Sequence, residues 1–405
     1  MANRRTFLTT CVALGGTFMM PRIAVASNAI KLGSILDTSG PFDAYGKPMD
    51  KALRLAVAKI NTSGGLLGKK VEVVSYDTQS DMALYSQYGQ KLTRQDKVDV
   101  VHGGILSASR EAIRQTMRKT ETLYFYNVLY EGGVCDRNIF INGITPAQQV
   151  EALVPYAMRK SGRKVYVLAA DYNYGQYMAG WIQKFVANNG GETVAVDFFP
   201  LDISDFGSTI AKIQTAAPDL IIAPLVGGAH LSFYRQWAAA GMKSKIPLAS
   251  PTLGAGNEHK VLTPEEGDGI MVAFNYSQEL DTVENIAFKK AWADANNGDQ
   301  SMHEIAVSSY NGIMTWAAGV AKAGSLNRDK VVEALETGIS INGPSGKVTV
   351  DPKTHHAILD VHIMDLKGQK MNVAETLPQR QPTDTQAVCD LQANPDDNTQ
   401  YEIKI

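Results

Sequence analysis

The sequence has few cysteines, little net charge and no long apolar segment beyond its first residues. Three cysteines occur in 405 residues, and 39 basic residues nearly balance 41 acidic ones. The resulting net charge of −2 gives no reason to expect nucleic acid or an anionic membrane surface as a partner. After the N-terminus, no stretch approaches the ~20 apolar residues that a membrane-spanning helix needs.

Sequence motifs of common enzymes are also missing. After the first strand-like run the chain reads Asp37-Thr38-Ser39-Gly40-Pro41, where a dinucleotide-binding turn would have a glycine-rich motif. Gly254-Ala255-Gly256 lacks the third glycine of that motif, and neither a P-loop nor a Gly-x-Ser-x-Gly elbow occurs. The seven histidines lack the i, i+4 pairing of a helical zinc site. We therefore expect no cofactor and no metal.

One enzyme hypothesis has named residues. Glu131 and Cys135, together with a lysine, would form a Glu-Lys-Cys amidase, in which a thiol nucleophile lies within reach of a base. Cys135 follows Gly132-Gly133 in a predicted loop, and no neighbouring residue fixes its position. We therefore expect a binding protein and not an enzyme.

The N-terminus has the order of regions typical of an export signal. Arg4 and Arg5 precede an apolar run from Phe7 to Met20, and Ala24-Val25-Ala26 is a small-residue cleavage site. The paired arginines resemble a twin-arginine signal, and the general export route is the alternative. Removal of residues 1–26 would leave a net charge of −5.

Two cysteines remain after residue 26. Cys135 and Cys389 could form one disulfide in an oxidising compartment, which would tie the C-terminal tail to the first half of the chain. Two free buried thiols are the alternative.

Strand-like and helical patterns alternate from Ile30 to about Ile270. The apolar positions 49, 52, 53, 56, 57 and 60 predict a helix that starts at Pro48 and ends before Gly64-Gly65. Short runs rich in valine and isoleucine, each followed by a helical pattern, predict parallel sheets covered on both faces. The predicted strands are Ile30–Leu36, Val71–Ser75, Val98–Val101, Leu123–Tyr126, Val165–Ala169, Val194–Phe198, Leu220–Pro224, Ile246–Ala249 and Ile358–Met364.

The predicted units form two sets, and a helix-rich stretch from Glu284 to Thr337 follows them. We assign residues 27–145 and 275–348 to a first lobe, and residues 146–274 and 349–405 to a second lobe. The predicted fold is α/β, with two doubly wound parallel-sheet lobes joined by a three-strand hinge. The cleft between the lobes is then the expected ligand site.

Four loops follow predicted strands, at the sheet edge where ligands of open α/β sheets bind. They cover residues 37–45, 103–110, 126–132 and 171–175. In the second loop, the Ser107 hydroxyl and free helical N–H groups offer hydrogen-bond donors to a ligand oxygen, although Ser107 could merely cap a helix. Tyrosines in the other loops suit a small, flat, uncharged ligand, or could pack at an interface.

These residues resemble a known family. The stretches Gly33–Gly40, Asn61–Gly68 and Val71–Asp77 resemble the N-terminal signature of type I periplasmic solute-binding proteins, the leucine/isoleucine/valine-binding family. The resemblance covers essentially the whole chain after residue 26. The segment Tyr126–Gly132, followed by Asn138-Ile139-Phe140, Pro146 and Gln148, is similar to the branch that binds or senses urea and short-chain amides.

The resemblance implies roles for individual residues. Ser107 would hold the ligand's oxygen, Tyr126 would form a wall from the first lobe, and Tyr172 and Tyr174 would close from the second lobe. The other expected ligand-binding residues are Ser39, Asn127, Gly227 and Thr252.

The sequence departs from the family pattern in two places. Amino-acid binders of this family neutralise the ligand's ammonium with a second-lobe glutamate, and the corresponding stretch Ser250–Gly254 has no acid. An unpaired ammonium is costly to bury, so a zwitterionic amino acid is disfavoured. Val128-Leu129 is larger and more apolar than is usual in the amide branch.

The expected function is that of the periplasmic solute-binding component of an ABC importer. It would capture urea or a short-chain amide between its lobes and deliver this small polar solute to the permease subunits in the membrane. One alternative is a branched-chain amino-acid-binding protein of an ABC importer. Another is an amide sensor that regulates an amidase operon, which the export signal disfavours. No nucleic-acid partner is expected.

Overall fold

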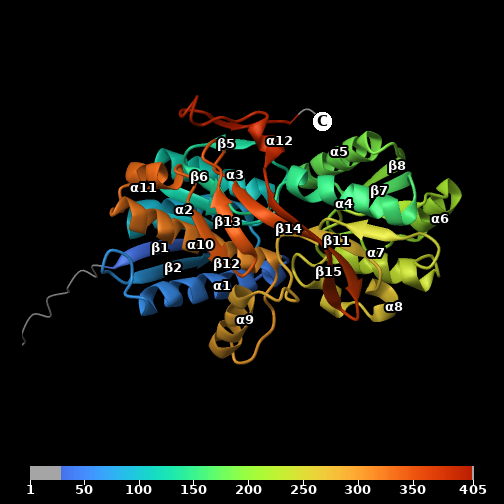
Figure 1. Cartoon of the computed structure of the whole chain (residues 1–405), viewed down its shortest axis with the longest axis horizontal. Coiled ribbons are helices and arrows are strands. Elements are labelled where there is room, and N and C mark those ends of the chain that lie inside the picture. Colours follow the sequence, from blue (N-terminus) through green and yellow to red (C-terminus); the bar gives the residue numbers. More distant parts are fainter. Residues whose placement is uncertain (1–28, 404–405) are drawn as a thin grey trace, which may run out of the picture.

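Two lobes lie side by side, and each consists of a sheet covered by helices (Figure 1). This computed structural model describes residues 29–403, so the predicted export signal lies outside the described part. In that part, no helix is both long enough and apolar enough to cross a membrane.

The first lobe contains a parallel five-stranded sheet with the order β2-β1-β3-β4-β6. Its strands are β1 (Ile30–Leu36), β2 (Val71–Asp77), β3 (Val100–Gly103), β4 (Leu123–Tyr126) and β6 (Ile139–Ile141). Its α-helices are α1 (Asp43–Thr62), α2 (Met82–Lys91), α3 (Ser107–Lys119), α9 (Val283–Ala295), α10 (Glu304–Ala323) and α11 (Arg328–Leu335). Because α1 packs against α10, and α10 against α11, the late helices return to the first lobe as the sequence predicts.

The first helix begins earlier than the sequence predicts. Pro48 was expected at its start, but α1 begins at Asp43 and contains Pro48 in its second turn. Proline lacks the N–H that would bond to the carbonyl four residues earlier, so the helix gives up one hydrogen bond there. The buried face formed by Met49, Leu53 and Ile60 follows the predicted spacing.

The second lobe contains a mixed sheet of nine strands. Eight of them follow the order β12-β13-β14-β11-β10-β9-β7-β8, and β15 pairs with β14. The strands are β7 (Lys164–Ala170), β8 (Glu192–Phe199), β9 (Leu220–Ile222), β10 (Leu248–Ser250), β11 (Met271–Phe274), β12 (Ser340–Gly343), β13 (Gly346–Val350), β14 (Ala357–Lys367) and β15 (Lys370–Arg380). The helices are α4 (Pro146–Ser161), α5 (Asn173–Asn188), α6 (Gly207–Ala216), α7 (Gly228–Ala239), the 3-10 helix η2 (Glu258–Val261) and α8 (Pro264–Gly267).

The sequence predicts a purely parallel sheet here, but the observed sheet is mixed. β7 to β11 pair in parallel, whereas β14 is antiparallel to β11, β13 and β15. The predicted lobe boundary at residue 348 falls inside β13, which joins the second-lobe sheet through β14. A continuous cluster of buried apolar side chains includes residues of both lobes, from Ile35 to Ile403.

Before its C-terminal tail, the chain passes between the lobes in three places. It leaves the first lobe after β6, returns after β11, and passes from α11 through the β12–β13 hairpin into β14. The first and third connections touch, because Ile141 forms a parallel bridge with His356 and donates its backbone N–H to the carbonyl of His355 at 3.0 Å. The three connections form the predicted hinge.

The C-terminal tail returns to the first lobe. Strand β16 (Asn398–Gln400) pairs with β5 (Val134–Asp136), and Cys135 and Cys389 are joined by a disulfide. This placement departs from the predicted assignment of all residues 349–405 to the second lobe. The short helix α12 (Thr383–Gln386) places the Asp384 carboxylate at the N-terminus of α4, where it accepts the Ala147 N–H at 3.0 Å.

Candidate functional site

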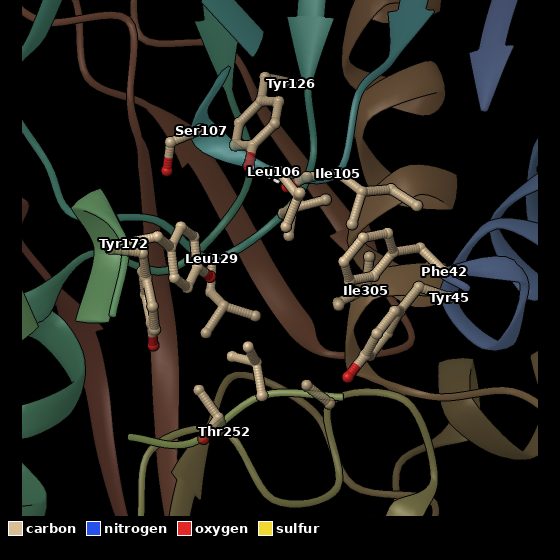
Figure 2. Close-up of a pocket in the computed structure, with 14 residues that line it drawn as sticks. Phe42, Tyr45, Ile105, Leu106, Ser107, Tyr126, Leu129, Tyr172, Thr252 and Ile305 are labelled. Atoms are coloured by element: carbon tan, nitrogen blue, oxygen red, sulfur yellow. Dashed lines mark hydrogen bonds between the residues drawn. The ribbon is translucent and has the colours of Figure 1, made fainter. Parts of the chain in front are cut away.

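A cavity lies between the lobes, and Figure 2 shows the fourteen residues that line it. The volume that the centre of a water-sized sphere can occupy inside it is about 50 Å³. One water needs roughly 10–15 Å³ by this measure, so the cavity has room for a molecule of a few heavy atoms. The lining residues are Phe42, Tyr45, Ile105, Leu106, Ser107, Tyr126, Val128, Leu129, Tyr172, Tyr174, Val226, Thr252, Ala255 and Ile305. Most of them are apolar or aromatic, and none is charged.

Several helices begin at this cavity. Leu106 and Ser107 stand at the start of α3, Tyr172 and Tyr174 at the start of α5, and Ile305 near the start of α10. The first N–H groups of a helix have no intrahelical acceptor and carry partial positive charge. The cavity is therefore suited to a ligand that presents an oxygen.

Ser107 lines the cavity but does not donate its hydroxyl proton to it. Its Oγ donates to Glu131 Oε2 at 2.7 Å, and both side chains are buried. The predicted donation from Ser107 to a ligand oxygen is therefore not available in this arrangement. The Ser107 oxygen retains its lone pairs and can accept a hydrogen bond from a ligand.

The second lobe contributes two tyrosines from neighbouring positions. Tyr172 and Tyr174 have ring centroids 6.0 Å apart, and both line the cavity. The hydroxyl of Tyr174 is buried and has no hydrogen-bond partner. Burial, together with the nearby Tyr172 and Glu131, raises the pKa of Tyr174 well above its ordinary value. The phenol therefore keeps its proton and can donate it to a ligand.

Two further predicted residues line the cavity, and their hydroxyls donate hydrogen bonds to backbone carbonyls of the protein. Tyr126 donates to the carbonyl of Ile105 at 2.6 Å, and Thr252 donates to the carbonyl of Leu225 at 2.6 Å. Both side chains form walls of the cavity, from the first and second lobe respectively (Figure 2).

Three of the predicted residues do not line the cavity. Ser39 donates its hydroxyl to Asp77 at 2.6 Å, and Asn127 lies beside His102 with a 3.4 Å contact between Nδ2 and Nδ1. Gly227 precedes α7 with a φ of 59°, and its neighbour Val226 contributes to the lining instead.

The two lobes are connected by hydrogen bonds across the cleft. Tyr45 of α1 donates to Glu258 of η2 at 2.6 Å, and Glu258 also accepts the backbone N–H groups of Gly254 and Gly256 at 3.0 Å. Burial and Glu258 raise the pKa of Tyr45, while a hydrogen bond from the Gly227 backbone acts in the opposite direction. A second-lobe acid is thus present at the cleft, but its carboxylate already accepts hydrogen bonds from Tyr45 and from the backbone.

Sequence reasoning did not assign a binding role to several of the lining residues. Phe42 directly precedes α1, Tyr45 lies in the first turn of α1, and Ile305 is the second residue of α10. Tyr45 lies in the first predicted binding loop, which was the available signal.

Three buried ionisable groups of the first lobe, Glu304, His102 and His303, are mainly neutral at neutral pH. Glu304 is fully buried next to Ile305, and burial raises its pKa to about 8. Burial also lowers the pKa of His102 and His303 to about 3, so both imidazoles are neutral. Among the described residues, no group of three or more His, Cys, Asp or Glu side chains could hold a metal ion.

The amidase arrangement considered above is not formed. Cys135 is bonded to Cys389, and Glu131 forms a salt bridge with Arg110 at 2.8 Å. A sulfur in a disulfide is not a nucleophilic thiolate, so Cys135 cannot play the catalytic role in this structure.

Comparison with known proteins gives consistent matches. The family model described as "Periplasmic binding protein" matches residues 29–370. The leucine-, isoleucine-, valine-, threonine- and alanine-binding protein of Pseudomonas aeruginosa is 24% identical over 338 residues, which cover 82% of this chain and 88% of that protein. The Leu/Ile/Val-binding protein of Escherichia coli is 23% identical over 285 residues, or 68% of this chain and 74% of that protein.

Solved structures share the fold. The solute-binding protein of an ABC transporter from Rhodopseudomonas palustris, in complex with 3,4-dihydroxybenzoic acid, superposes with a TM-score of 0.78 at 23% identity, over 87% of this chain and 98% of that one. The isoleucine-bound substrate-binding protein of a branched-chain amino-acid transporter from Streptococcus pneumoniae gives a TM-score of 0.77 at 23% identity, over 86% and 99% of the two chains.

Proposed function

The chain belongs to the periplasmic binding protein family, and on this basis we propose that it is the periplasmic component of an ABC importer that captures urea or a short-chain amide. The ligand binds between the lobes, and the closed complex delivers it to the permease subunits in the membrane. A ligand favours closure only if it binds the closed form more tightly than the open form. Here the lining comes from both lobes, which supports that condition.

The observation that carries the ligand class is the uncharged lining of a small cavity. Urea and acetamide each present one carbonyl oxygen and an NH₂ group. The Tyr174 hydroxyl and the helix N-termini suit the oxygen, and the Ser107 oxygen, which can only accept, suits an N–H group.

Leucine, isoleucine and related amino acids are named as ligands of the curated relatives, so they form the second candidate class. An amino acid would place an ammonium between apolar walls, and the carboxylate of the second-lobe Glu258 already accepts a hydrogen bond from Tyr45. Burying a charge without a partner is strongly unfavourable. The geometry therefore favours the uncharged amides over the amino acids.

We expect urea or acetamide to raise the melting temperature of the protein more than leucine or benzoate at equal concentration. Binding to the folded state raises stability by RT ln(1 + [L]/Kd), so a thermal-shift screen ranks the candidate ligands. Purified protein without residues 1–26 is the material. A shift with leucine that exceeds the shift with every urea and amide tested would promote the amino-acid class.

A further inference from the structure

A buried chain of three side chains lies behind the first-lobe wall of the cavity. Arg110 Nη2 donates to Glu131 Oε1 at 2.8 Å, and Ser107 Oγ donates to Glu131 Oε2 at 2.7 Å. The relative exposure is 1% for Arg110, 4% for Glu131 and 5% for Ser107. Only Ser107 of the three reaches the cavity.

Other residues hold these three hydrogen-bonded side chains in place. The Arg110 guanidinium lies 4.7 Å from the ring centroid of Tyr130 and 5.3 Å from that of Tyr126. It also donates to Gln400 of the C-terminal tail at 2.9 Å. These contacts fix Arg110 in place, and Arg110 in turn holds the Glu131 carboxylate.

The charge of Glu131 determines which way the Ser107 hydroxyl points. A carboxylate in a salt bridge has no proton to donate, so it can only accept. A serine hydroxyl has one proton and two lone pairs. Because the proton is directed to Glu131, only lone pairs remain for the cavity.

We propose that Glu131 is a positioning residue that makes Ser107 an obligate acceptor, so that the site selects ligands with an N–H donor over carboxylates of the same size. This inference rests on the proposed amide-binding function and deepens it. Acetamide and acetate have the same number of heavy atoms and differ in whether NH₂ or a charged oxygen occupies one position. An acetate oxygen at Ser107 would face lone pairs, with the Glu131 carboxylate directly behind them.

The decisive variant is Glu131→Gln, because an amide can donate to Ser107 and release the serine proton toward the cavity. Calorimetric titration with acetamide and acetate gives the ratio of the two affinities for each protein. The wild type should prefer acetamide, and the variant should lower that preference roughly tenfold to hundredfold, as expected for the loss or reversal of one buried hydrogen bond. Ser107→Ala should also lower the preference, and adding Glu131→Gln to it should change the ratio no further.

Glu111→Gln is the matched control. Glu111 accepts a hydrogen bond from Arg110 Nε at 3.1 Å. The substitution therefore removes one negative charge beside the same arginine and leaves the hydrogen bond between Ser107 and Glu131 in place. The preference for acetamide should stay at the wild-type value. An equal loss in Glu111→Gln would assign the effect to charge alone and overturn the proposal.

The remaining outcomes separate the role of Glu131 from the amide-binding function. A wild type that prefers acetamide, with an unchanged ratio in Glu131→Gln, refutes the role of Glu131 and leaves the amide-binding function standing. A wild type that binds acetate as tightly as acetamide refutes both, and so does a wild type that binds none of acetamide, acetate and urea. If Glu131→Gln does not fold, as judged by its melting curve, Ser107→Ala alone decides, because an unchanged ratio there excludes Ser107 as the selecting acceptor.

Discussion

At the scale of single residues, the most informative group is the Tyr174 hydroxyl. It is a buried donor without a partner, in a cavity that otherwise exposes few polar atoms. A buried polar group without a hydrogen bond destabilises the folded protein by about 1–3 kcal/mol. A ligand oxygen that accepts this hydrogen bond would remove that penalty.

We therefore expect Tyr174→Phe to weaken ligand binding without lowering the stability of the free protein. The affinity for acetamide or urea, measured by calorimetry, should fall roughly tenfold to hundredfold. The melting temperature without ligand should stay the same or rise, because no protein hydrogen bond is lost. Tyr166→Phe is the control, since Tyr166 donates to Asp197 on the same lobe but lies outside the cavity lining. Unchanged affinity in Tyr174→Phe would exclude the phenol as a ligand donor.

The sequence could predict which loops meet at the cavity, but not which side chain of each loop faces it. Tyr126 lines the cavity and the next residue, Asn127, does not, because successive side chains of an extended segment point to opposite sides. From the sequence, the Ser39 hydroxyl is an equally plausible ligand contact, but in the structure it donates to Asp77. Such choices depend on neighbours that are distant in the sequence.

At the scale of elements, most of the parallel strands were predictable from their apolar runs, whereas the largely exposed strand β15 was not. Strands β1 and β4 have the predicted bounds, since their side chains are nearly all buried and rich in apolar residues. Strand β15 was missed because most of its side chains are exposed, so its sequence has no apolar alternation. Its hydrogen bonds with β14 hold it in place, and these depend on the partner strand.

The bridge between Cys135 and Cys389 is the covalent link between the tail and the first lobe. In protein without residues 1–26, no thiol should react with a maleimide after denaturation without reductant. Replacing both cysteines with serine should lower the free energy of unfolding by roughly 2–5 kcal/mol, because a closed loop of 254 residues restricts the unfolded chain. Chemical denaturation of the two proteins measures this difference. Two labelled thiols per chain in material taken directly from the periplasm would contradict the bridge.

At the scale of the whole molecule, ligand release depends on contacts that join the lobes outside the ligand. Tyr45 and Glu258 form such a contact across the cleft, and Asn257 donates to the carbonyl of Ser301 at 2.8 Å. Each joins the two lobes directly and would be lost if the lobes separated. The two-lobed architecture itself was predictable from the sequence, whereas these contacts were not, because each joins residues more than forty positions apart.

We expect Tyr45→Phe to speed ligand release about tenfold and to leave the association rate unchanged. The removed hydroxyl is bonded to Glu258, so the substitution weakens the closed form and not the first encounter of the ligand with an open lobe. Stopped-flow fluorescence measures both rates. Tyr76→Phe, which removes a hydrogen bond to Asp96 within the first lobe, is the control. A slower association with unchanged release would mean that Tyr45 acts on entry and not on closure.

The C-terminal tail has a practical consequence for anyone wishing to watch this protein work. Its last described residues lie over the junction of the lobes (Figure 1), bonded to β5 of one lobe and, through Glu402, to Tyr177 of the other at 2.8 Å. A donor dye on β16, which pairs with β5, would stay with the first lobe, while an acceptor dye on α6 would travel with the second. Energy transfer between the two would then report each opening, and the protein would serve as an optical sensor for the molecule it captures.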